Sequence, residues 1–263
     1  MDIRHFSPNQ REVVEASDGP LSILAGPGSG KTTVLAGRIA YLVEQRGVAA
    51  TTVLAITFTT AAAATLRLRL AGVLGDAARD LTITTFHALG LRLIRKWSGE
   101  LGFRGGVPAV YGRDDARLLL REVASGFGLE VATEGRGRDT DPWALSLSKL
   151  AFALDRFRLG WIDSSRNSHE HDDVDEELLR PLSAAYEEQL QKRSAVDFAS
   201  MLTLPLRLFE SEPRSLRVVQ DAYRFVMADE FQDTSDAEFK MLRRVVERHR
   251  NLAVVGDVSG MYG

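Results

Sequence analysis

Two stretches of the sequence combine residue types suited to phosphate and metal chemistry. The first is a glycine-rich turn made of Gly26, Gly28, Ser29, Gly30, Lys31, Thr32 and Thr33. Backbone amides in such a turn, together with the N-terminus of the helix that follows, bind anionic phosphates. Lys31 can reach the terminal phosphates of a nucleoside triphosphate, and the Thr32 hydroxyl can ligate Mg²⁺. The turn is therefore a predicted phosphate-binding loop, although Ala25 occupies the position where such loops usually have their first glycine.

The second stretch, far along the chain, carries the carboxylates that such a loop requires. Asp229 and Glu230 follow the apolar run 225–228, which predicts a buried strand ending at Asp229. Ligands of open α/β sheets bind at the carboxyl ends of the strands. We expect Asp229 to hold Mg²⁺ directly or through water, and Glu230 to orient and deprotonate an attacking water molecule. The two stretches together predict a site for ATP and Mg²⁺.

The hydrophobic pattern around these stretches alternates strands with helices. Short apolar runs predict strands at 21–24, 53–58, 81–85, 225–228 and 252–255. Helical spacing of apolar residues predicts helices at 8–16, 32–45, 61–74, 88–98 and 236–248. Continuous apolar strands are typical of parallel sheets covered on both faces, so the fold class is a doubly wound α/β fold.

The middle of the chain lacks this alternation of strands and helices. Between about residues 105 and 193 no strand is expected, and helices are expected at 114–127, 143–158 and 175–192. We interpret this part as a helical subdomain inserted into the α/β domain, which divides the chain into residues 1–104, 105–193 and 194–263. The acid-rich stretch 163–177, with His169 and His171, is expected to be a solvated loop rather than a partner surface or metal site.

Composition narrows the class of protein further. The chain has 263 residues and no cysteine, which excludes disulfides and thiolate metal sites and fits a cytosolic protein. A net charge of −3 argues against indiscriminate binding of polyanions. No apolar run approaches the ~20 residues that a membrane span requires, and the N-terminus lacks the pattern of a signal peptide. We therefore expect no membrane association.

Six short motifs, in this order along the chain, carry a family resemblance. They occupy residues 6–11, 55–62, 84–89, 196–202, 229–234 and 254–257. From about residue 6 to residue 257 the chain resembles the N-terminal half of UvrD/Rep-type superfamily 1 DNA helicases. The resemblance implies a RecA-like P-loop NTPase domain with a parallel sheet and an inserted helical subdomain.

The resemblance also implies roles for particular residues. Gln10 is expected to bond the adenine base, and Gln232 to communicate between the nucleotide and DNA. Single-stranded DNA is the expected partner, with contacts from Thr57, Phe58, Thr59, Thr85 and His87. Threonine hydroxyls at strand ends can bond phosphates, and a phenylalanine face can stack on a base of any sequence.

Three positions depart from the family pattern. Gly260 stands where the family has a glutamine that senses the terminal phosphate, so that coupling residue is absent. Thr60 and Ala61 replace an Asn-Lys pair, which removes one positive charge from the DNA motif. Thr33 stands where many members have an arginine packed on the adenine. We expect weaker nucleotide binding as a result.

The sequence leaves three functions open. The first is the ATP-binding portion of a DNA helicase, moving 3′ to 5′ by resemblance. The second is a nucleotide-dependent module that binds DNA or a protein without productive turnover. The third is a small-molecule kinase, for which no acceptor pocket or arginine-rich lid is evident, and which would leave the DNA motifs unexplained.

Family members carry a second RecA-like domain that supplies arginines to the phosphates. This chain alone is therefore expected to hydrolyse ATP slowly and not to unwind DNA, unless a second half or a partner protein completes it. The altered pattern after Asp257 indicates a truncated or frame-disrupted helicase. An engineered fragment or a split protein would give the same sequence.

Overall fold

The protein consists of two compact units. The computed structural model describes residues 5–26, 28–103, 105–129, 131, 146–160 and 174–257. One unit, the sheet unit, comprises residues 1–89, 208–234 and 238–263, and the other, the helical unit, comprises residues 90–207 and 235–237.

A five-stranded parallel sheet forms the centre of the sheet unit. Its strands, in spatial order, are β1 (Leu21–Leu24), β7 (Leu252–Gly256), β6 (Phe225–Ala228), β2 (Val53–Ile56) and β3 (Thr82–Thr84). The predicted parallel sheet is confirmed, with β2 and β3 shorter than expected and β7 one residue longer. Because all strands run the same way, their carboxyl ends lie along one edge of the sheet.

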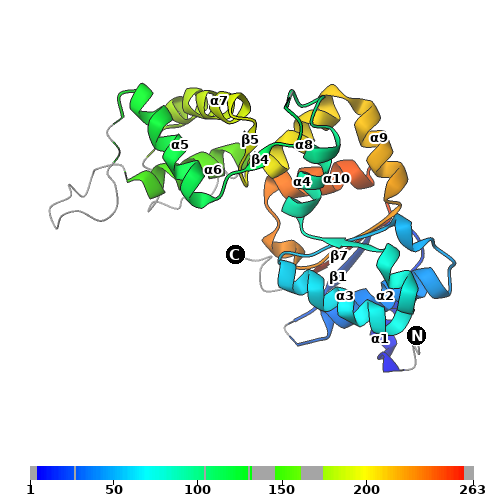
Figure 1. Ribbon diagram of the computed structural model, residues 1–263. Coiled ribbons are helices and arrows are strands. Elements are labelled where there is room, and N and C mark those ends of the chain that lie inside the picture. Colours follow the sequence, from blue (N-terminus) through cyan, green and yellow to red (C-terminus); the bar gives the residue numbers. More distant parts are fainter. Residues whose placement is uncertain are drawn as a thin grey trace. The chain divides into compact units, whose positions relative to one another are not determined.

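Helices cover both faces of this sheet (Figure 1). On one face lie α2 (Lys31–Glu44) and α3 (Thr60–Leu74), and α1 (Pro8–Glu15) packs on α2. On the other face lie α9 (Pro213–Ala222) and most of α10 (Asp236–Val246). Short 3₁₀ helices are η2 (Ala50–Thr52), η3 (Gly75–Asp80) and η4 (Phe231–Asp233). Apolar side chains of α2, α3 and the strands form one core, which includes Leu35, Ile39, Ala55, Leu66 and Leu70.

The helical unit has its own apolar core. Helices α5 (Arg113–Gly126), α6 (Leu147–Leu159) and α7 (Glu176–Lys192) pack around buried side chains such as Leu119, Leu150 and Leu182. Two-residue strands β4 (Ala109–Val110) and β5 (Ala195–Val196) pair in parallel in the same unit. Helices α4 (Phe86–Lys96) and α8 (Ser200–Ser211) each begin in one unit and end in the other.

Some sequence expectations were wrong or untested. The absence of strands from 105–193 was wrong, because β4 lies there. A two-residue strand pairs through backbone groups with a distant segment, so its side chains give no periodic signal. Helices α8 and α9 were not predicted, and Pro205 inside α8 weakens its helical pattern. Trp143, residues 163–173 with His169 and His171, and Gly260 lie outside the described residues.

No helix among the described residues has both the length and the apolar composition needed to cross a membrane.

Close packing of α1 on α2 fixes the position of Gln10. The Gln10 amide donates to the Ser7 hydroxyl at 3.3 Å, and the Ser7 amide donates to the Gln10 side chain at 3.0 Å, which caps α1. The buried guanidinium of Arg38, on α2, donates to backbone carbonyls at the end of α1, including that of Ala16 at 3.0 Å. Gly37 leaves room for Phe6 to pack on α2, because a Cβ at Gly37 would lie 2.6 Å from the Phe6 ring.

Substitution Gly37→Ala should therefore destabilise the sheet unit. The added methyl group must displace Phe6, an overpacking cost of about 1–3 kcal/mol that exceeds the gain of up to about 1 kcal/mol from replacing glycine with alanine inside α2. Chemical unfolding monitored by circular dichroism measures the change. Gly72→Ala is a matched control, because a Cβ at Gly72 on α3 meets nothing within 4 Å and should stabilise the helix slightly. Equal stability of Gly37→Ala and the wild type would contradict this packing.

Candidate functional site

The glycine-rich turn connects β1 to α2 at the carboxyl edge of the sheet. Gly28 and Gly30 have positive φ angles of 76° and 83°, which residues with a side chain rarely adopt. Gly30 is the N-cap of α2, so Lys31 and Thr32 occupy the first helical turn. The Ala25 amide donates to the Gly256 carbonyl at 3.3 Å, which holds the turn beside the end of β7.

The turn and the distant acidic motif meet in space. The Thr32 hydroxyl, in the first turn of α2, donates to the carboxylate of Asp229, the residue that follows β6, at 3.3 Å. The Lys31 ammonium donates to the Ala25 carbonyl at 3.1 Å and forms an ion pair with Asp257 at 3.2 Å. Sequence analysis predicted the meeting of these stretches but not the ion pair with Asp257.

Asp229 is a buried carboxylate in a crowded electrostatic environment. Burial raises the pKa of the Asp229 carboxyl above its ordinary value, and the neighbouring Glu230 charge raises it further. Hydrogen bonds from the Glu230 amide and the Thr32 hydroxyl oppose this rise in the pKa. A cation bound beside Asp229 would favour the charged carboxylate, which is the form that ligates a metal ion.

Glu230 has a strained backbone and a fixed side chain. Its φ angle of 52° places a non-glycine residue in the left-handed region, which costs of order 1 kcal/mol. Gln232 donates to the Glu230 carboxylate at 2.8 Å and accepts a hydrogen bond from the Asp257 amide at 2.9 Å. Gln232 thereby connects Glu230 to the end of β7.

Some of these residues line a cavity of about 460 Å³. It is lined by Gly28, Gly30, Lys31, Thr32, Thr33, Arg69, Glu230 and Asp257. The Thr33 hydroxyl accepts a hydrogen bond from Arg69, on α3, at 2.7 Å. Gln10 donates to the Ser29 carbonyl at 3.1 Å, beside Gly30. Sequence analysis missed Arg69, since only the fold brings α3 to this cavity.

The donor set suits Mg²⁺ better than a metal held by protein ligands alone. Within the described parts of the chain, no three His, Cys, Asp or Glu side chains gather as they would around such a metal. Thr32 and Asp229 offer one hydroxyl and one carboxylate oxygen, and Mg²⁺ commonly binds one or two such groups together with water and substrate phosphates.

The predicted DNA contacts lie at the ends of β2 and β3, along the same edge of the sheet. Phe58 is 56% exposed, which leaves its ring available for stacking. Thr57 is buried and donates to the Thr59 carbonyl at 2.9 Å. The hydroxyls of Thr59 and Thr85 accept hydrogen bonds from the amides of Ala62 and Ala88, at 3.0 and 3.2 Å, at the starts of α3 and α4. The three threonines thus shape the local backbone.

His87 lies close to an acidic residue that sequence analysis had not singled out. Its ring nitrogen Nδ1 is 4.0 Å from the carboxylate of Glu238, a buried residue on α10. Burial lowers the pKa of His87 below its ordinary value, and the Glu238 charge opposes that change.

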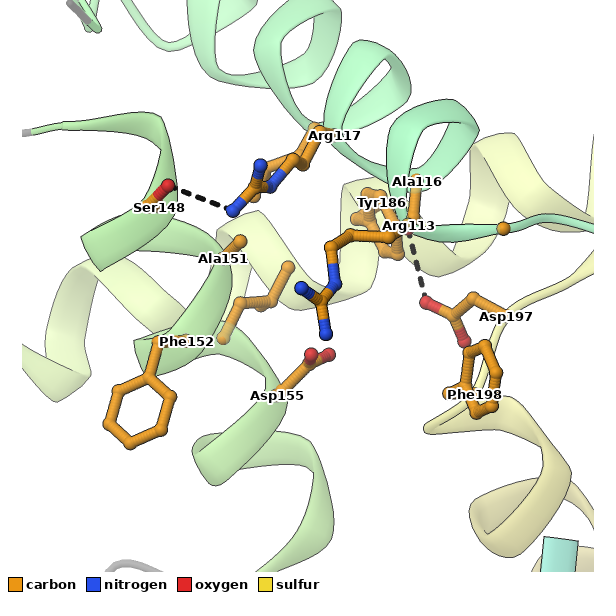
Figure 2. Close-up of a pocket in the computed structure, with 13 residues that line it drawn as sticks. Arg113, Ala116, Arg117, Ser148, Ala151, Phe152, Asp155, Tyr186, Asp197 and Phe198 are labelled. Atoms are coloured by element: carbon orange, nitrogen blue, oxygen red, sulfur yellow. Dashed lines mark hydrogen bonds between the residues drawn. The ribbon is translucent and has the colours of Figure 1, made fainter. Parts of the chain in front are cut away.

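The motif residues Asp197 and Phe198 border a separate cavity in the helical unit, also of about 460 Å³ (Figure 2). Asp197 accepts hydrogen bonds from Arg158 at 2.6 and 3.1 Å and from Tyr186 at 3.1 Å. Burial alone would raise the pKa of Asp197, but Arg158 lowers it below its ordinary value. Asp155 also lines this cavity, and burial together with the Asp197 charge raises its pKa to about 6.

A parallel sheet of five strands, with a glycine-rich loop facing a strand-terminal acidic residue, defines the sheet unit as a RecA-like P-loop α/β domain. The sequence profile of the UvrD/REP helicase N-terminal domain matches residues 6–260. The chain therefore belongs to the UvrD/REP helicase N-terminal domain family.

Individual relatives agree with this assignment. The chain is 34% identical to the ATP-dependent DNA helicase PcrA of Leuconostoc citreum, over 97% of this chain and 33% of that protein. It is 33% identical to the ATP-dependent DNA helicase UvrD1 of Mycobacterium tuberculosis (strain ATCC 25618 / H37Rv), with the same coverage. The chain spans about a third of the length of these curated relatives.

The raised pKa of Asp155 predicts a pH-dependent stability. Because the pKa in the folded state is about 6 and the ordinary value is 3.8, the folded protein favours the protonated carboxyl. The contribution of Asp155 to the free energy of unfolding is therefore fully present below about pH 4 and is lost as the pH rises through about 6. Asp155→Asn cannot ionise, so it should lose less stability than the wild type across this range. Urea unfolding of both proteins at the two ends of the range measures this, and equal losses would contradict it.

Proposed function

We propose that this chain is the ATP-binding and ATP-hydrolysing portion of an ATP-dependent DNA helicase or translocase. The observation that carries the proposal is the meeting of Thr32 with Asp229 and of Lys31 with Asp257 around one cavity. The family assignment and the names of the relatives support the same function. In this proposal, residues 1–104 and 194–263 form the ATP-binding domain, and residues 105–193 form the inserted helical subdomain.

Each residue of the site has a proposed role in hydrolysis. Lys31 leaves Asp257 and stabilises the negative oxygens of the terminal phosphates. Glu230, held by Gln232, orients the attacking water and accepts its proton. Thr32 and Asp229 hold Mg²⁺, which when bound neutralises phosphate charge. Gln10 bonds the adenine, and the amides of Gly26, Gly28, Ser29 and Gly30, with Thr33 beside them, surround the phosphates.

Single-stranded DNA is the proposed second ligand. Exposed Phe58 stacks on a base, while the polar groups of Thr57, Thr59, Thr85 and His87 lie nearby at the ends of β2 and β3. Gln232 connects the nucleotide to β7 and is the proposed route of communication with DNA. By analogy with the family, translocation would run 3′ to 5′.

The 263-residue chain alone is proposed to be a slow ATPase. In P-loop NTPases, arginines supplied by another domain or a partner raise the rate by ~10³ to 10⁵. Within the described residues, the cations that line the cavity are Lys31 and Arg69. A second half or partner protein that supplies such arginines would complete the motor.

A nucleotide-dependent binding module without turnover is the second candidate function. The ion pair between Lys31 and Asp257 favours it, because the lysine is already occupied by a carboxylate that phosphates must displace. Gly260, at the position of the family's phosphate-sensing glutamine, also favours it.

Glu230→Gln separates the two functions. If Glu230 is the base, this variant should lose activity by about 10²- to 10⁴-fold while still binding Mg·ATP, because the amide cannot accept the proton of water. Steady-state ATPase rates, with and without single-stranded DNA, together with nucleotide binding by calorimetry, measure these effects.

Glu247→Gln is a matched control that removes an exposed carboxylate beside Arg244, away from the cavity. Its rate should equal that of the wild type. A wild-type rate that responds neither to DNA nor to Glu230→Gln, while nucleotide still binds, would contradict hydrolysis and support the binding module.

A further inference from the structure

The cavity of the helical unit has an apolar wall and takes no part in the proposed nucleotide site (Figure 2). Its lining comes from α5, α6, α7 and the segment after β5, which all belong to that unit. Buried Leu120 and Leu154 form part of the wall, together with Ala116 and Ala151. A cavity of about 460 Å³ that combines apolar side chains with a few polar groups is typical of a site for a small molecule.

Two phenylalanine rings border this cavity and are open to solvent. Phe152, on α6, is 49% exposed, and Phe198, after β5, is 57% exposed. Figure 2 shows the two rings on opposite sides of the cavity. An exposed ring gains stability when an apolar ligand covers it, because apolar surface is removed from water. The rings therefore favour a ligand with an aromatic or other apolar body.

Two guanidiniums of α5 supply positive charge to the same cavity. Arg117 donates through Nη2 to the hydroxyl of Ser148 at 2.9 Å, and Figure 2 shows the Arg113 side chain extending into the cavity. Within the part of the chain that the structure describes, neither guanidinium forms an ion pair. Arginine binds carboxylates well, because its planar group offers two parallel N–H donors.

The carboxylates of the cavity leave an excess of positive charge. Asp197 accepts hydrogen bonds from Arg158 at 2.6 and 3.1 Å, so that charge is already balanced inside the protein. Asp155 is the other carboxylate of the lining. With the pair of Asp197 and Arg158 set aside, two positive charges on α5 face one negative charge on Asp155. A ligand with a single negative charge would make the cavity neutral.

The same features argue against a stretch of nucleic acid as the ligand. A polynucleotide carries one negative charge per nucleotide and binds along grooves lined by many cations. Here Asp155 lies in the cavity, and Asp114 and Asp115 follow Arg113 in the first turn of α5. These carboxylates would repel a polyanion.

We propose that the cavity of the helical unit binds a small organic acid, which has one carboxylate on an aromatic or branched apolar body. Its carboxylate binds Arg113 and Arg117. Its apolar body packs against Leu120 and Leu154, with the phenylalanine rings at its sides. The inference goes beyond the proposed function, since it gives the helical unit a ligand of its own and does not depend on ATP.

The test measures binding of indole-3-acetate to the full 263-residue chain by calorimetry. Arg117→Gln removes a charged donor to the carboxylate and should weaken binding about tenfold. Asp155→Asn removes the opposing negative charge and should tighten binding about threefold. Thermal unfolding at the wild-type temperature shows that each variant is folded.

Matched controls separate the charge of the probe from its apolar body. Indole-3-acetamide has the same ring system without the charge, so Arg117→Gln should change its binding less than about twofold. Arg121→Gln removes an equally charged side chain of α5 that lies outside the cavity lining, and its affinity for indole-3-acetate should equal that of the wild type.

Several results would overturn the proposal. One is failure of the wild type to bind indole-3-acetate, and another is binding that neither Arg117→Gln nor Asp155→Asn changes. Displacement of the probe by a single-stranded oligonucleotide would assign the cavity to nucleic acid instead. Displacement by a non-hydrolysable ATP analogue would place the probe in the nucleotide cavity, whereas the proposal expects the two ligands to bind together.

Discussion

The parallel alignment of β1, β7 and β6 is the constraint on which the site depends. Leu24 is paired with Gly256, so β1 and β7 end at the same level, and Ala228 is paired with Val254, so β6 ends two residues earlier along the same edge. The strand ends lead to the side chains of the proposed site, which are Lys31 after β1 and the glycine-rich turn, Asp229 directly after β6 and Asp257 directly after β7. An antiparallel strand at any of these places would carry its terminal residues to the opposite edge. The apolar core beneath the sheet stabilises this alignment, and the chemistry of the site is a consequence of it.

The charged side chains at this cavity are already bonded to other protein groups. Lys31 is bonded to Asp257, while Gln232 connects the amide of Asp257 to the carboxylate of Glu230. A triphosphate that takes Lys31 from Asp257 would therefore also change the surroundings of Gln232 and Glu230. The left-handed backbone at Glu230 adds strain at the same point, where a change of contacts could release it. This arrangement gives a physical link between Lys31, the Glu230 carboxylate and the end of β7, and the proposed function would use that link.

Local patterns were sufficient to predict the sheet, and insufficient for contacts made between elements. Apolar runs gave the bounds of β1 and β6 as they are observed, because buried parallel strands have a strong signal. The two-residue strands β4 and β5 and the proline-containing helix α8 lack such a signal. The meeting of Thr32 with Asp229 followed from the general rule for strand ends. The contacts of Arg69 with Thr33, Lys31 with Asp257 and His87 with Glu238 join segments far apart in sequence, and no spacing rule predicts them.

A crystal structure of the chain with Mg²⁺ and a non-hydrolysable ATP analogue tests the central claim most directly. The account predicts that the Lys31 ammonium has left Asp257 and binds a phosphate oxygen, with Thr32 and Asp229 beside the metal ion. An analogue bound elsewhere, with the ion pair between Lys31 and Asp257 intact, would contradict it.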